Sequence, residues 1–143
     1  MLPFWRLEPP FRFAVYITFS VLFASGAAWL VANALKESAE GEFWQESGAY
    51  LLALHGGAAM LILMLLGALF PLHIGRAWQA RKNRATGIIV TICNAALIAT
   101  AFGLYYLSSD ALRPWSSDLH ISFGLALPLL LLAHIKIGRA QRK

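Results

Sequence analysis

Four long apolar stretches dominate this sequence, and they restrict the chain to folds that lipid can surround. Each stretch is roughly 20 residues or longer, which is the length an α-helix needs to cross a hydrocarbon core of ~30 Å. A spanning segment must satisfy its own backbone hydrogen bonds, and the stretches lack the polar and apolar alternation of a barrel strand. The sequence therefore predicts an all-α integral membrane protein, a four-helix bundle.

The four predicted helices occupy residues 13–35, 50–74, 86–107 and 119–138. The connections between them are short, so residues 1–143 are expected to form a single transmembrane domain. Hydrophobic residues make up 59% of the chain and charged residues 13%, a balance too apolar for a soluble domain of this length. The lipid bilayer is thus the first predicted partner.

Basic residues concentrate at one predicted side of the membrane. They lie between the second and third helices and in the C-terminal tail: Arg76, Arg81, Lys82, Arg84, Lys136, Arg139, Arg142 and Lys143. The positive-inside rule places both segments in the cytoplasm, and an even number of crossings places the N-terminus there too. Because topology accounts for the net charge of +5, no nucleic-acid partner is expected.

All four histidines lie in two of the predicted helices, His55 and His73 in the second and His120 and His134 in the fourth. Ionisable residues inside a bilayer normally face a bundle interior, a partner or a cofactor. An interval of 18 residues is five whole α-helical turns and one of 14 is within about 40° of four turns, so each pair is expected to share one helical face.

The predicted ligand pairs are His55 with His120 near the outer surface and His73 with His134 near the inner surface. Imidazole ligates haem iron, and bundle cofactors sit between facing helices, so two bis-histidine haems are expected. At 1.5 Å per residue the intervals span about 27 Å and about 21 Å, a mismatch that a kink at Pro71 would reduce. No Cys-x-x-Cys-His sequence is present, so both haems are expected to be non-covalent b haems.

Two further features surround the histidines. The sequence Ile-Gly-Arg-Ala follows both His73 and His134, so Arg76 and Arg139 are expected at the inner surface. These arginines would pair with haem propionates or, equally, anchor the helices at lipid phosphate. Glycines such as Gly26 and Gly57 mark places where a macrocycle or another helix could approach the backbone closely.

A family resemblance rests on four helices, histidines at both ends of two of them, and the dipeptides Leu54-His55 and Leu119-His120. With these features the chain resembles the bacterial di-haem b-type membrane cytochromes, which include cytochrome b subunits of respiratory dehydrogenases and hydrogenases. The resemblance covers about residues 13–139. It implies a protein of the bacterial inner membrane that carries electrons between the quinone pool and a redox partner.

The leading hypothesis is therefore an electron-transfer protein, or the cytochrome b subunit of an oxidoreductase complex. A small four-helix transporter and a structural or assembly subunit are the alternatives, and neither would bind haem. Partners would include quinone and a c-type cytochrome or a redox-enzyme subunit. The acidic first connection would attract a basic partner if it docks one, and it carries four acids: Glu37, Glu40, Glu42 and Glu46.

Overall fold

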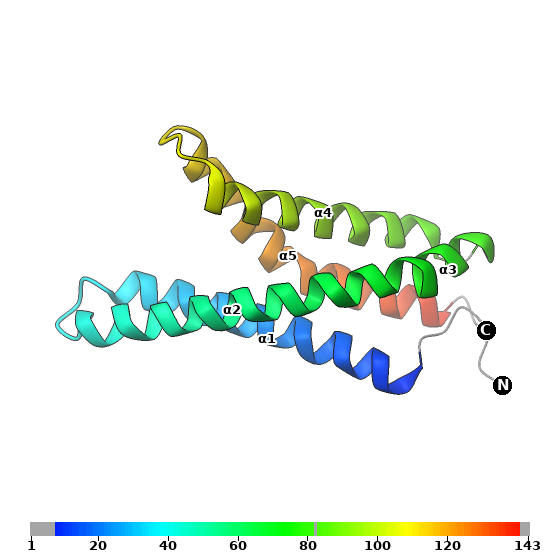
Figure 1. Ribbon diagram of the computed structural model, residues 1–143. Helices are drawn as coiled ribbons and strands as arrows, with labels where there is room; N and C mark the ends of the chain where they lie inside the picture. The colour runs from blue at the N-terminus through cyan, green and yellow to red at the C-terminus, as the bar shows by residue number, and fades with distance from the viewer. Residues whose placement is uncertain (1–7, 82, 141–143) are drawn as a thin grey trace. The chain divides into compact units, whose positions relative to one another are not determined.

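The chain is built from four long helices. A computed structural model describes residues 8–81 and 83–140, and these residues contain no β-strand. The elements are α1 (Pro9–Leu35), α2 (Gly41–Leu69), the π-helix η1 (Phe70–Gly75), α3 (Arg76–Gln79), α4 (Arg84–Tyr106) and α5 (Leu112–Ala140) (Figure 1). The all-α prediction is confirmed. Lys82, Arg142 and Lys143 of the predicted basic segments lie outside the described residues.

Four helical segments of the described chain are long and apolar enough to cross a membrane, as the sequence predicts for a multi-pass membrane protein: Pro9–Leu35, Gly41–Gln79, Arg84–Tyr106 and Leu112–Ala140. All four helices begin earlier than predicted, and two of them do so by seven residues or more. The second starts at Gly41 instead of residue 50, and the fourth at Leu112 instead of residue 119. Hydropathy marks only the apolar part of a helix, whereas backbone hydrogen bonding continues into polar residues such as Glu42, whose charge suits a helix N-terminus.

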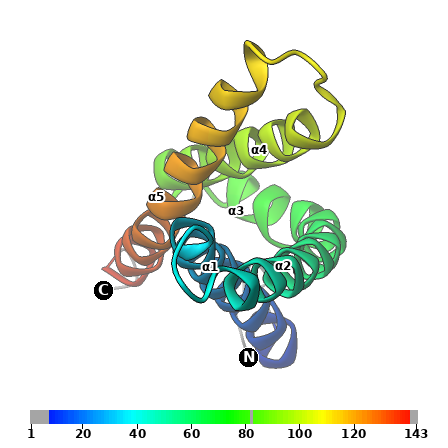
Figure 2. The same ribbon diagram turned by 90° about the vertical axis from the view of Figure 1, so that its left-hand side faces the viewer.

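The helices pair into two compact units, one extending to Arg76 and the other starting at Ala77. In the first unit α1 packs on α2, and in the second α4 packs on α5 (Figures 1 and 2). Each unit is a helical hairpin with a short connection. The prediction of a single domain concerns the packing of one unit on the other and stays a prediction.

Small and polar side chains make the contact inside the first hairpin. Val15, Thr18, Ser25 and Ala32 are the buried residues of α1, and their spacing of three and seven residues puts them on one face. Thr18 and Ser25 donate to backbone carbonyls one turn earlier, so their buried hydroxyls are satisfied within the helix. Close packing of small residues is the usual way for helices to associate in lipid.

The second hairpin buries even fewer side chains. Cys93 is 3% exposed and its Sγ atom lies 3.7 Å from the carbonyl of Phe123, so it packs between α4 and α5. A Cβ atom added at Gly103 would lie 2.9 Å from the hydroxyl of Ser116, which shows how closely α5 approaches α4 there. Most large apolar side chains of both hairpins remain exposed within the described chain, as expected for helices that lipid surrounds.

Candidate functional site

His55 lies on α2 and hydrogen-bonds to α1. Its Nδ1 atom is 3.0 Å from the carbonyl oxygen of Leu22 and 3.1 Å from the hydroxyl of Ser25. A carbonyl oxygen only accepts, so Nδ1 carries the proton and donates it. Ser25 directs its own single proton to the carbonyls of Val21 and Leu22, at 2.7 and 3.1 Å, and so acts as a second acceptor for Nδ1. This assignment leaves the lone pair of the neutral ring on Nε2.

The imidazole of His55 also packs directly on the backbone of α1. A Cβ atom added at Gly26 would lie 3.1 Å from Cε1 of His55 and 3.3 Å from Nδ1. Contacts of that length would require the ring to move by a few tenths of an ångström, so glycine favours the observed position of the ring. Gly57, on α2, has no atom within 4 Å of such a Cβ. Of these two glycines, only Gly26 lies close to the ring of His55.

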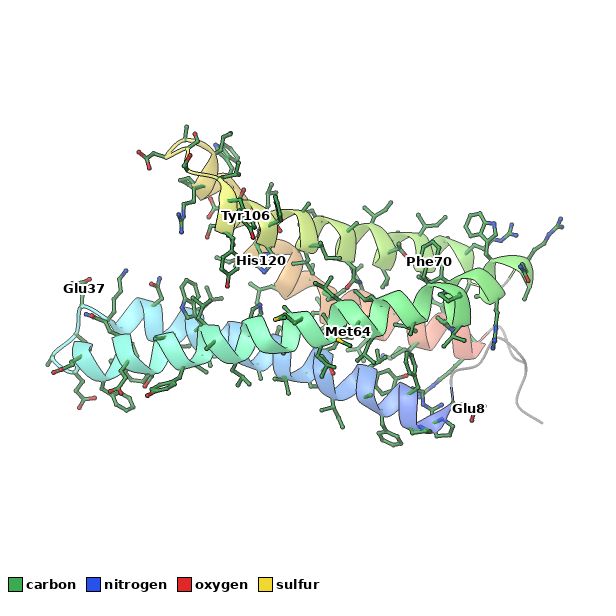
Figure 3. All side chains as sticks on the ribbon, in the orientation of Figure 1. Glu8, Glu37, Met64, Phe70, Tyr106 and His120 are labelled. Atoms are coloured by element: carbon green, nitrogen blue, oxygen red, sulfur yellow. The ribbon has the colours of Figure 1, made fainter. Side chains whose placement is uncertain are left out.

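His120 on α5 has a hydroxyl partner on the helix it packs against. His120 is labelled on the ribbon in Figure 3. Its Nδ1 atom lies 3.0 Å from the Oγ1 atom of Thr100 on α4. Thr100 donates its single proton to the carbonyl of Ala96, at 2.8 Å, and is left to accept from His120. His120 thus has the same tautomer as His55, with Nδ1 as the donor and the lone pair on Nε2.

His134 lies in a polar cluster formed by the two ends of the second hairpin. Asn83 donates through Nδ2 to the backbone carbonyl of His134 at 2.9 Å, and the hydroxyl of Thr86 donates to Oδ1 of Asn83. Nδ1 of His134 lies 2.9 Å from the Thr86 hydroxyl and 3.1 Å from Nδ2 of Asn83. Either tautomer satisfies this cluster, because Thr86 accepts from a protonated Nδ1 and Asn83 donates to an unprotonated one.

Asn83 is suited to this cluster by its backbone. It precedes α4 with φ 49° and ψ 37°, a left-handed conformation that asparagine tolerates better than most residues. Its side chain faces Gly138 of α5, where an added Cβ would lie 3.1 Å from Nδ2. The cluster thus ties the start of α4 to the end of α5.

His73 is in η1, the π-helical turn between α2 and α3. Pro71 is one of the first residues of this turn and has no N–H to donate, so it disfavours a regular α-helix. The kink predicted at Pro71 therefore takes the form of a π-helix. The prediction that His55 and His73 share one face assumes an unbroken α-helix, and this assumption is wrong. The extra residue of a π turn rotates the helical face by up to about 100°.

The predicted site residues are divided between the two units. His55 and His73 belong to the first hairpin, and His120 and His134 belong to the second. Pairing His55 with His120 and His73 with His134 would join the units and stays a prediction. Arg76 and Arg139 are exposed. Within residues 8–81 and 83–140, no three side chains of His, Cys, Asp or Glu come together as a metal site, whereas axial ligation of one haem takes two.

The hydrogen-bond partners of the histidines could not be identified from the sequence. Ser25 and Thr100 are each one of several hydroxyl residues in their apolar stretches, and such residues usually bond to their own helix backbone. The one available signal is Asn83 directly ahead of an apolar run, because asparagine is favoured at the start of a helix. No protein-family model matches the chain, and no curated protein or solved structure shows a significant similarity to it.

Proposed function

We propose that this protein is a di-haem b-type membrane cytochrome that transfers electrons across the bilayer, between the quinone pool and a redox partner. The partner would be a c-type cytochrome or an enzyme subunit. In this proposal the protein resides in the bacterial inner membrane with both termini in the cytoplasm. The axial ligands form two pairs: His55 with His120, and His73 with His134.

One observation carries the proposal: the Nδ1 atoms of His55 and His120 both donate to an acceptor on the neighbouring helix. Histidines that ligate metals usually donate one ring N–H to a carbonyl or other acceptor, which fixes the tautomer and orients the second nitrogen. The tautomer that results leaves Nε2 of each ring as the nitrogen that would ligate iron. The outer pair thus has the chemistry of axial ligands.

The group that these residues would hold is haem b, which supplies a reversible one-electron change at iron when bound. The chain itself supplies the ligand orientation. The carbonyl of Leu22 and the hydroxyl of Ser25 hold the ring of His55, and Gly26 allows that ring to reach the backbone of α1. Thr100 holds the ring of His120 in the corresponding way.

The two inner ligands differ from the outer two in their surroundings. His73 lies in a π-helical turn, a form often found at functional sites. His134 has both hydroxyl and amide partners. Arg76 and Arg139 follow these two histidines, are exposed, and would pair with propionates at the inner surface.

The test is the haem content of the purified protein. We expect a pyridine haemochrome spectrum of two non-covalent b haems per chain. His55→Ala and His120→Ala should each remove the same spectral component, and His73→Ala and His134→Ala the other. Met64→Leu is the control, because Met64 is 74% exposed and should leave both components intact.

Two results would contradict the proposal at different levels. Absence of haem b from the wild-type protein, or a covalent haem, would refute a b-type cytochrome altogether. If His55→Ala and His73→Ala removed the same component, the protein would bind haem but the proposed pairing would be wrong.

A further inference from the structure

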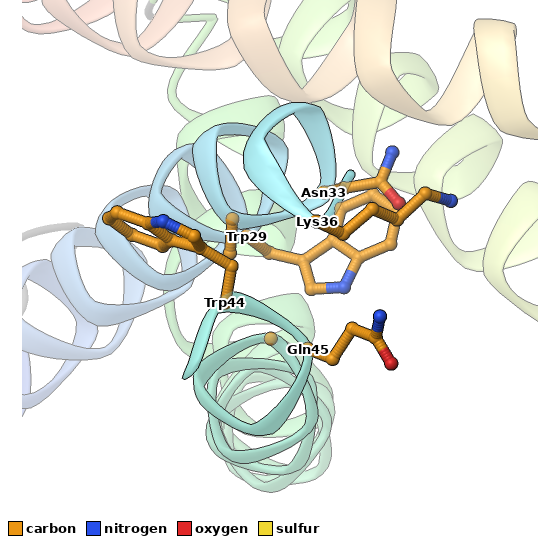
Figure 4. A pocket seen from close by; sticks show the side chains of 7 residues that line it. Trp29, Asn33, Lys36, Trp44 and Gln45 are labelled. Atoms are coloured by element: carbon orange, nitrogen blue, oxygen red, sulfur yellow. The ribbon is translucent and has the colours of Figure 1, made fainter. Parts of the chain in front are cut away.

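The turn end of the first hairpin carries a pocket of about 170 Å³ between α1 and α2 (Figure 4). Trp29 and Asn33 line it from α1, Lys36 lines it from the residue directly after α1, and Trp44 and Gln45 line it from α2. Its volume is below the roughly 300 Å³ at which sites for whole drug-sized ligands begin. A pocket of this size suits one polar group of a larger molecule.

Small residues create the space beneath the tryptophans. Ala32 is 1% exposed and lies opposite Gly48, where an added Cβ would be 3.8 Å from the Cβ of Ala32 and 3.9 Å from Cδ1 of Trp29. The two helices therefore touch at the floor of the pocket. The indole of Trp29 stands over this contact as one wall, and its half-buried position leaves part of the ring available to a ligand.

Lysine and tryptophan side chains line the pocket, glutamates lie in the adjoining turn, and together they suit a zwitterion. The exposed ammonium of Lys36 attracts phosphate, and within the described residues it forms no ion pair with the neighbouring Glu37 or Glu40. Indole faces attract organic ammonium groups. The glutamates of the turn would repel a headgroup of net negative charge and favour one that carries an ammonium beside its phosphate.

The position of the pocket along α1 indicates which molecule would supply the phosphate and the ammonium group. Helix α1 ends at Leu35, directly before Lys36, and the mostly polar residues 36–42 follow it, so the pocket lies at the polar end of a helix long and apolar enough to cross a membrane. Tryptophan concentrates at this depth in membrane proteins, alongside the phospholipid headgroups. We propose that the pocket binds the headgroup of a zwitterionic phospholipid, with its phosphate at Lys36 and its ammonium at the tryptophans. This site is independent of the proposed haem function.

Native mass spectrometry of protein released from nanodiscs tests this site. The nanodiscs contain equal parts of phosphatidylethanolamine and phosphatidylglycerol, and the ratio of the two retained lipids is measured. We expect the wild type to retain phosphatidylethanolamine preferentially. Lys36→Gln should lower its retention about twofold to fivefold, the loss expected for one exposed ion pair. Trp44→Leu tests the aromatic wall and should also lower it. Lys136→Gln, a change of an exposed lysine outside the pocket, should have no effect.

The possible outcomes separate the sources of the ligand. Equal retention of phosphatidylethanolamine by the wild type, Lys36→Gln and Trp44→Leu would overturn the proposal. Preferential retention of phosphatidylglycerol would also overturn it, because the site would then select net negative charge. If soluble phosphoethanolamine at millimolar concentration displaced the lipid fully, the pocket would be a site for a soluble headgroup compound and the lipid assignment would fail.

Discussion

Replacement of Thr100 by valine tests the proposed ligand geometry most directly. The Oγ1 atom of Thr100 lies 3.0 Å from Nδ1 of His120. The Thr100 hydroxyl donates its own hydrogen bond to the carbonyl of Ala96. Valine has almost the same shape but no hydroxyl, so Thr100→Val should preserve the packing of α4. The Nδ1–H of His120 would lose this acceptor.

The expected magnitude follows from two independent estimates. Removing the partner of a buried hydrogen-bonding group costs about 1–3 kcal/mol. Loss of an outer-shell partner of a ligating histidine lowers metal affinity about 10–100-fold, which is about 1.4–2.7 kcal/mol. Because His120 is only half-buried, the lower part of the range applies. We expect haem affinity at the His120 site to fall about tenfold.

Haem titration of apoprotein, followed by the absorbance of bound haem, measures this change. Thr100→Ser retains the hydroxyl and should restore most of the affinity. Thr91→Val is the matched control, because Thr91 is also on α4 and donates to the carbonyl of Gly87, and it is exposed. If Thr100→Val and Thr91→Val bound haem with the wild-type affinity, the hydroxyl would have no part in holding a ligand.

Three other predictions test the remaining features. Gly26→Ala should weaken haem binding, because its Cβ would lie 3.1 Å from Cε1 of His55, whereas Gly57→Ala meets no atom within 4 Å; equal haem affinities for the two variants would contradict the role of Gly26. The double variant Glu40→Lys, Glu42→Lys should slow electron transfer to a basic soluble cytochrome and reduce its salt dependence in stopped-flow measurements. Unchanged rates would mean that the redox partner docks on another surface of the protein. Fluorescent-protein fusions at both termini should be fluorescent and alkaline phosphatase fusions inactive, and the opposite pattern would reverse the proposed orientation.

The helices themselves could be predicted because lipid imposes a length and an apolar composition on each one. Their polar extensions could not, since residues 41–49 and 112–118 continue the backbone hydrogen bonding beyond the apolar part. The π-helix at Pro71 was also beyond prediction in detail. A proline signals an irregular turn, but hydropathy carries no information on whether the chain kinks or inserts a residue.

The candidate ligands could be named from the sequence because ionisable residues are rare in membrane spans. Their partners could not be named. Thr18 and Ser25 lie on the same face of α1, so which of them meets His55 depends on how far α2 is shifted along α1, and both hydroxyls lie in equally apolar surroundings. The structure selects Ser25, whose Oγ is 3.1 Å from the imidazole, while Thr18 bonds to the carbonyl of Ala14.

The local hydrogen bonds of the histidines have a consequence for assembly. His55 is oriented by α1, and His120 and His134 by α4, so each ring is held by a helix of its own hairpin. A hairpin inserted into the bilayer would thus already carry oriented imidazoles. Cofactor binding would then not have to order these side chains. The entropic cost of ordering them would already have been met when the hairpin folded. Such preorganisation would let haem insertion be the last step of biogenesis rather than the step that shapes the site.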